Sequence, residues 1–167
     1  MLSSSSRLCK VNSHEAASIG AARPKALIIP LGQLGQHHGY HVCGSGCLPF
    51  EKGNPEWLYD LVWLTYSDDG FRMIGVPLVL ECEWGRHPDD VDYDFEKLLL
   101  ARADHRVMIF QGTPEQHFNR MIERVRHCGL TRPGDRYLLL CFDWAVRRFT
   151  SRLFVAAGDG ENLVGSL

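Results

Sequence analysis

The chain has 167 residues, of which 45% are hydrophobic, 23% charged and 10% aromatic. A chain of this length forms about one domain and can bury a sizeable core. It has no run of about 18 apolar residues, and its start lacks the apolar segment of a secretory signal, which argues against a membrane-spanning or exported protein. The six scattered cysteines show no disulfide framework. We therefore expect a soluble, cytoplasmic globular protein without a membrane partner.

The net charge of −2 hides a segregation of charge along the sequence. Residues 51–96 carry twelve acids against three Lys or Arg, whereas residues 1–50 have a net charge of +3 and residues 97–153 one of +6. The total alone gives no reason to expect a nucleic-acid partner. An acidic block between two basic segments is, however, compatible with a metal site flanked by phosphate contacts, so net charge does not exclude such a partner.

The composition predicts three parts along the chain. Residues 1–23 are rich in serine and poor in large apolar side chains, which is typical of a disordered tail. Their near lack of acids is also compatible with an organellar transit peptide. We expect a single α/β domain over residues 24–157 and a C-terminal tail over 158–167.

Hydrophobic periodicity, together with the positions of Gly, Pro and capping residues, divides this domain into alternating helices and strands. The expected helices cover 24–36, 92–103 and 114–128, and the expected strands cover 40–42, 57–66, 71–74, 78–84, 106–110, 137–142 and 149–155. Pro77 is expected to separate two strands, and Asp92 to cap the second helix. Both faces of the strands are mostly apolar, so we predict a central mixed β-sheet flanked by helices.

Acids within apolar strands are the unusual feature of this sequence. Asp60 lies within an aromatic and β-branched segment, and Glu81 and Glu83 follow an apolar run. A buried carboxylate is costly unless it is protonated, paired or bound to a metal. Strand periodicity puts Glu81 and Glu83 on one face, and Asp60 joins them if the two strands are neighbours. Three such oxygen donors suit Mg²⁺ or Mn²⁺; the alternative is that each acid is a solvated rim residue or the partner of a nearby Arg.

These segments, in this order, resemble a known family. They are EWLYDLVW at 56–63, LVLECEW at 78–84, DFEKLL at 94–99 and VMIF at 107–110. A helix, a strand, a strand with Asp, a strand ending in Glu-x-Lys, a helix and a strand form the core of the PD-(D/E)xK nucleases. The resemblance covers roughly residues 25–112. It implies the restriction-endonuclease-like fold, an α/β sandwich.

The resemblance also implies roles for individual residues. Asp60 matches the metal-binding Asp of the family, and Glu81 matches the acid of the (D/E)xK motif. Glu83 stands where the motif has its lysine, which is a departure from the family pattern. Some members carry that lysine on the following helix, where Lys97 is the candidate. Lys97 lies about 200° around the helix from the packed Phe95, however, so the alternative is a solvated helix lysine.

The function implied by the resemblance is metal-dependent hydrolysis of phosphodiester bonds in DNA or RNA. Asp60, Glu81 and Glu83 are expected to hold Mg²⁺ or Mn²⁺, with Glu83 also orienting the attacking water. The residues expected to contact phosphates are Arg120, Arg124, Arg147 and Arg148. Because enzymes of this fold are often dimers, a homodimer is compatible with the resemblance. The alternative function is a catalytically inactive module on the same fold that binds nucleic acid or protein, after loss of the motif lysine.

Two histidine-containing segments offer further candidates. The stretch from His37 to Cys47 contains three His and two Cys, which are zinc ligands, but no second Cys pair follows downstream. The alternative for this stretch is a helix end followed by a Gly-rich loop. His87 follows Glu83 closely and is a candidate auxiliary base, or else a surface loop histidine.

Overall fold

The computed structural model describes residues 26–44, 57–85, 87–157 and 163–165. Within these residues the chain forms one mixed sheet of seven strands and three helices. The strands are β1 (His41–Gly44), β2 (Leu61–Tyr66), β3 (Met73–Glu83), β4 (His105–Gln111), β5 (Arg136–Asp143), β6 (Arg148–Val155) and β7 (Leu163–Gly165). The helices are residues 26–37, α2 (Pro88–Leu100) and α3 (Pro114–His127).

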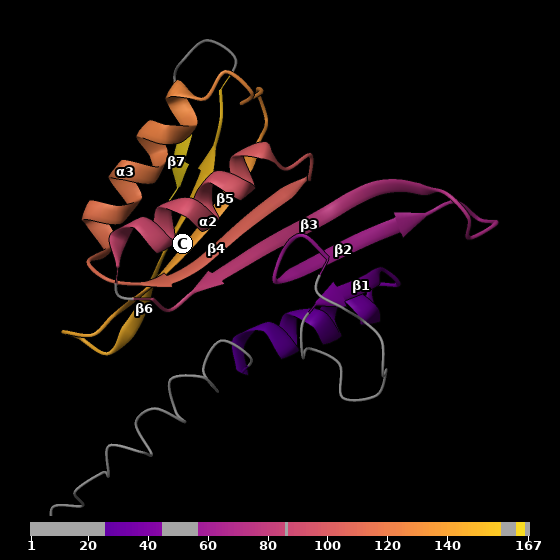
Figure 1. Cartoon of the computed structure of the whole chain (residues 1–167), viewed down its shortest axis with the longest axis horizontal. Coiled ribbons are helices and arrows are strands. Elements are labelled where there is room, and N and C mark those ends of the chain that lie inside the picture. Colours follow the sequence, from indigo (N-terminus) through magenta and orange to yellow (C-terminus); the bar gives the residue numbers. More distant parts are fainter. Residues whose placement is uncertain (1–25, 45–56, 86, 158–162, 166–167) are drawn as a thin grey trace, which may run out of the picture.

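The strands lie in the sheet in the order in which they occur in the sequence (Figure 1). Neighbouring strands are antiparallel except for β3 with β4 and β4 with β5, which are parallel. Parallel neighbours need a crossover, which α2 supplies between β3 and β4 and α3 supplies between β4 and β5. The carboxyl ends of β3, β4 and β5 therefore share one edge of the sheet.

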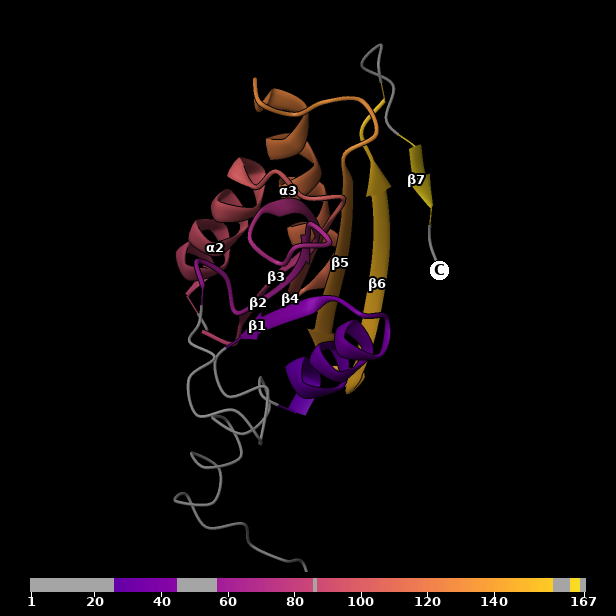
Figure 2. The ribbon, with the colours of Figure 1, turned by 90° about the vertical axis from the view of Figure 1, so that its right-hand side faces the viewer.

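Helices cover both faces of the sheet. Helices α2 and α3 lie on one face and the helix at 26–37 lies on the other (Figure 2). The first face buries Phe95 and Phe118 in a large cluster, whereas the second packs Ile28 with Leu61 and Leu80. This arrangement confirms the predicted α/β sandwich around a mixed sheet. None of the helices in the described residues has the length and apolar character needed to span a membrane.

Strand β3 differs from the prediction at Pro77. The sequence led us to expect two strands separated there, but β3 runs unbroken from Met73 to Glu83. The missing N–H of Pro77 costs little at this position. Pairing with β4 begins only at Leu78, and the register with β2 shifts between Trp63 and Thr65 on the opposite side.

The N-cap of the helix after β3 lies five residues earlier than predicted. It is His87, and Pro88 occupies the first turn, where its missing N–H is tolerated. The predicted N-cap, Asp92, therefore lies inside α2, where it pairs with Arg120 at 2.9 Å. Pro88 was the sequence signal for the true start of the helix.

Three further boundaries bear on the predictions. Strand β2 begins at Leu61 rather than at residue 57, so Asp60 lies just before the strand. Strand β7 falls within the expected C-terminal tail, where it pairs with β6. The tail predicted for residues 1–23 lies outside the described residues.

Candidate functional site

Asp60 reaches the edge of the sheet through a tight turn. Leu58 is in the left-handed region at φ 65°, is 70% exposed, and sits between the bridged residues Trp57 and Tyr59. The chain then enters β2, whose Leu61 pairs with Leu80 of β3. Antiparallel register therefore sets Asp60 beside the end of β3, where its Oδ2 accepts a hydrogen bond of 2.7 Å from the backbone N–H of Cys82.

Glu81 is a buried carboxylate on the face of β3 that α2 covers. Its side chain is 1% exposed, and its Oε1 lies 2.8 Å from Nζ of Lys97. The same ammonium lies 2.9 Å from Oδ1 of Asp94, one helical turn earlier. The alternative of a solvated helix lysine is therefore wrong. The apolar stripe of α2 lies over the sheet interior, but the flexible Lys97 side chain extends sideways to the end of β3.

Glu83 lies on the same side of β3 as Glu81. Its Oε1 accepts a hydrogen bond from the backbone N–H of Gly85, and its side chain also interacts with Asp94. Burial raises the pKa of Glu83, and the neighbouring carboxylates of Asp94 and Asp90 raise it further. Glu83 therefore does not replace the motif lysine as a cation. It adds another acid beside Asp94.

The electrostatics of this cluster follow from burial and from an excess of acids. Burial raises the pKa of Glu81 to about 8, with contributions from Asp60 and Asp94, although the hydrogen bond from Lys97 opposes the shift. Burial alone would lower the pKa of Lys97, but Glu81 and Asp94 raise it above its ordinary value. Lys97 is therefore a permanent cation at neutral pH, and Glu81 can hold or release a proton near that pH.

The donor set suits a hard divalent cation. We refer to Asp60, Glu81, Glu83, Asp94 and Lys97 as the acid–lysine cluster; it has four carboxylates and one ammonium. With every group ionised, the cluster has a net charge of −3. All its acidic ligands are oxygen donors, which Mg²⁺ and Mn²⁺ prefer. As the side chains stand, no three His, Cys, Asp or Glu of the described residues are grouped closely enough to hold a metal ion.

Two of the expected phosphate-binding residues have carboxylate partners instead. Arg120 and Arg124 both pair with Asp92, at 2.9 and 2.8 Å, and Arg124 also pairs with Glu96. These contacts join α3 to α2 and leave little of either guanidinium group for phosphate. The prediction of phosphate contacts then rests on Arg147 and Arg148, which are exposed.

The two histidine-containing segments have different outcomes. His87 caps α2, where its Nδ1 accepts from the N–H of Asp89 at 3.4 Å, and it is not part of the acid–lysine cluster. In the candidate zinc segment, the first helix ends at His37 and Cys43 is buried in β1 as a free thiol, whose pKa burial raises. Cys47 lies outside the described residues.

Sequence reasoning missed two members of this neighbourhood. Asp94 lies three residues before Lys97, a spacing that places two side chains together on a helix and could have been used to find it. Tyr59 is half-buried, and burial followed by the charge of Glu81 raises its pKa. Nothing in the sequence distinguished Tyr59 from the other aromatic residues of its segment.

No protein-family model matches the chain, and no curated protein matches its sequence. The function must therefore be argued from the site itself.

Proposed function

We propose that the protein is a divergent nuclease of the PD-(D/E)xK type that hydrolyses phosphodiester bonds of nucleic acid with Mg²⁺ or Mn²⁺. The observation that carries this proposal is the 2.8 Å contact between Lys97 and Glu81, beside Asp60. The order of elements supports it: a helix, three antiparallel strands, a helix and a parallel strand. The lysine that the motif lacks at position 83 is supplied in space by α2.

Each residue then has a role that its position suits. Asp60 and Glu81 would hold the metal ion, which on binding polarises the phosphate and lowers the pKa of the attacking water. Lys97 stabilises the negative charge that develops on the phosphate oxygens. Glu83, whose pKa is raised, accepts a proton from water at its carboxylate. Asp94 positions Lys97 through their 2.9 Å contact.

The inactive-module alternative is weakened by the position of Lys97. A site that had lost its catalytic lysine would leave Glu81 buried without a cation, at a considerable cost in stability. Here Lys97 supplies that cation, with its Nζ 2.8 Å from Oε1 of Glu81. A purely structural role would need one acid for one lysine, whereas Lys97 contacts two acids, Glu81 and, at 2.9 Å, Asp94.

A cleavage assay tests the proposal. The purified full chain is incubated with supercoiled plasmid, circular single-stranded DNA and a structured RNA, each with Mg²⁺, Mn²⁺ or EDTA. We expect divalent-dependent cleavage of at least one substrate. Asp60→Ala should reduce the rate by about a hundredfold or more.

Asp68→Ala is the matched control, because Asp68 is an exposed acid in the turn after β2. It should leave the cleavage rate unchanged. Metal-independent binding of nucleic acid, with no cleavage under any divalent ion, would instead support the inactive module.

A further inference from the structure

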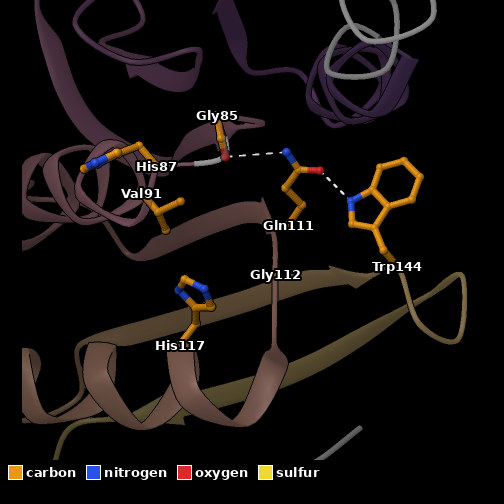
Figure 3. A pocket seen from close by; sticks show the side chains of 7 residues that line it. All are labelled: Gly85, His87, Val91, Gln111, Gly112, His117 and Trp144. Carbon is orange, nitrogen blue, oxygen red and sulfur yellow. Dashed lines mark hydrogen bonds between the residues drawn. The ribbon is translucent and has the colours of Figure 1, made fainter. Parts of the chain in front are cut away.

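A pocket lies next to the acid–lysine cluster at the same edge of the sheet. It has a volume of about 330 Å³, near the lower end of the range of roughly 300–1,000 Å³ for small-ligand pockets, so it suits one ring system. Its walls come from the end of β3, from β4, from both crossover helices and from the turn between β5 and β6 (Figure 3). The residues lining it are Gly85, His87, Val91, Gln111, Gly112, His117 and Trp144.

Trp144 forms one wall of the pocket as an exposed but anchored aromatic ring. The residue is 49% exposed, yet its indole N–H donates a 2.6 Å hydrogen bond to Oε1 of Gln111. The amide nitrogen of Gln111 donates to the carbonyl group of Trp84 and, as Figure 3 shows, to that of Gly85. Phe142 supports the Trp144 ring edge to face, with 4.9 Å between centroids. An exposed aromatic surface held in one orientation is preorganised for stacking.

The charges around the pocket favour a neutral ring over a phosphate. A Cβ added at Gly85 would lie 2.7 Å from Oδ2 of Asp90 and 2.8 Å from Oε1 of Glu83, so carboxylates border that wall. On another wall, burial lowers the pKa of His117 and the charge of Arg120 lowers it further. Arg120 donates to Nδ1 of His117, so the neutral ring keeps its proton on Nε2 as a donor.

Two arginines suited to neutralising flanking phosphates follow Trp144: Arg147 in the same turn and Arg148 at the start of β6. Arg147 and Arg148 are exposed, and Arg147 occupies the left-handed region at φ 53°. An anchored aromatic ring with two exposed arginines next to it combines base stacking with backbone neutralisation, which is how proteins hold single strands. A paired base, stacked inside a duplex, cannot enter a pocket of this kind.

From this geometry we propose that the pocket binds one unpaired nucleobase of the substrate, stacked on Trp144, so that the enzyme acts on single-stranded nucleic acid. This inference rests on the proposed function and specifies its substrate class. Gly85, which borders the pocket, is two residues from Glu83 of the acid–lysine cluster. The bound base therefore belongs to a nucleotide next to the phosphate that is cut.

Binding in EDTA tests the pocket separately from cleavage. Fluorescence anisotropy would measure the affinity of the full chain for labelled oligothymidylate and oligouridylate of about 12 nucleotides, for the matching DNA duplex, and for an abasic strand of equal length. We expect single strands to bind more tightly than the duplex. The thymidylate should bind about tenfold more tightly than the abasic strand. The uridylate arm shows whether RNA is accepted as well as DNA.

The variants show whether Trp144 receives the base. Trp144→Ala should lower the affinity for thymidylate about tenfold and leave that for the abasic strand unchanged, whereas Trp144→Phe should keep most of the affinity. Phe71→Ala, at an 88% exposed aromatic in the turn between β2 and β3, should change neither. Equal losses on both strands, equal binding of the two strands by the wild type, or duplex binding as tight as single-strand binding would overturn the proposal.

The two proposals fail in different ways. A single strand that binds through Trp144 but is not cut in Mg²⁺ or Mn²⁺ would uphold the pocket and refute the nuclease. Cleavage of duplex and single strand at equal rates, unchanged by Trp144→Ala, would uphold the nuclease and refute the pocket.

Discussion

Two clusters of acids and bases lie on different sides of α2, and they differ in charge balance. On one side, Asp92 and Glu96 pair with Arg120 and Arg124 of α3, two acids with two cations. On the other, the acid–lysine cluster has four acids and only Lys97. Both clusters contain ion pairs at similar distances, so only the balance of charge distinguishes them.

The difference is between an ion-pair network that holds two helices together and a cluster with an excess of acids. A balanced network neutralises its own charges, so it needs nothing further. An unbalanced and partly buried set of acids destabilises the fold unless protons or cations are bound. This excess of acids is why we propose a divalent cation at the end of β3 rather than between α2 and α3.

The largest expected effect is on the cleavage rate, which should depend on the acid–lysine cluster and not on the balanced network. Lys97→Met should reduce the rate of nucleic-acid cleavage by about a hundredfold or more, because it removes the cation to which the proposed function assigns the phosphate. Arg124→Met is the matched control, since it removes a helix cation of similar exposure from the balanced network. Its rate per folded molecule should equal that of the wild type. Equal losses in the two variants would contradict the distinction.

The second effect is on stability and depends on pH. The pKa of Glu81 is about 8 in the folded state against an ordinary value of 4.5, so the folded protein keeps a proton that the unfolded chain has lost. The stabilisation that this bound proton provides is therefore fully present below about pH 4.5. It is lost as the pH rises through about 8.

Glu81→Gln removes this titration. In urea unfolding, the free energy of unfolding of the variant should rise by roughly 2–4 kcal/mol relative to that of the wild type as the pH increases from 4.5 to 9. Added Mg²⁺ should stabilise the wild type and not the variant. A difference in unfolding free energy between the two proteins that does not change with pH would show that the pKa of Glu81 is not raised in the folded protein.

A smaller effect is expected in the balanced network. Asp92→Asn weakens two ion pairs that are about one third exposed on the arginine side, and it should cost about 1–2 kcal/mol of unfolding free energy. Chemical denaturation measures the loss. Cleavage per folded molecule should not change, and a loss of activity in this variant would mean that the network contributes to the site.

The smallest effect concerns the turn that leads to Asp60. Leu58 is exposed and adopts φ 65°, a conformation that asparagine tolerates better than leucine. Leu58→Asn should raise the free energy of unfolding by about 0.5–1 kcal/mol. Thermal unfolding detects a gain of this size, and a loss would indicate that the leucine side chain has a packing role.

The sequence was a good guide to the layers of the fold and a poorer one to its boundaries. Apolar runs and capping residues predicted a mixed sheet between helices. Pro77 was misleading because a strand tolerates proline where one neighbour has not yet begun to pair. Asp92 was misleading because a good capping residue can also serve as an ion-pair partner inside the helix.

Local pattern identified the acids of the candidate site but not how they meet. Asp60, Glu81 and Glu83 stood out as acids among apolar residues. Lys97 was only a weak candidate, because its angle around the helix points away from the packed stripe and its side-chain reach is set by how α2 lies on the sheet. The pocket could not be predicted, since Gln111 and Trp144 are 33 residues apart and meet only through the order of the strands.

The most direct test is the binding of Mn²⁺ to the two clusters, measured by electron paramagnetic resonance and calorimetry without nucleic acid. We predict saturable binding to the wild type and to Asp92→Asn, and its loss in Asp60→Asn and Glu81→Gln. Absence of saturable binding to the wild type, or binding that survives both Asp60→Asn and Glu81→Gln, would contradict the assignment of the acid–lysine cluster as a metal-dependent hydrolytic site.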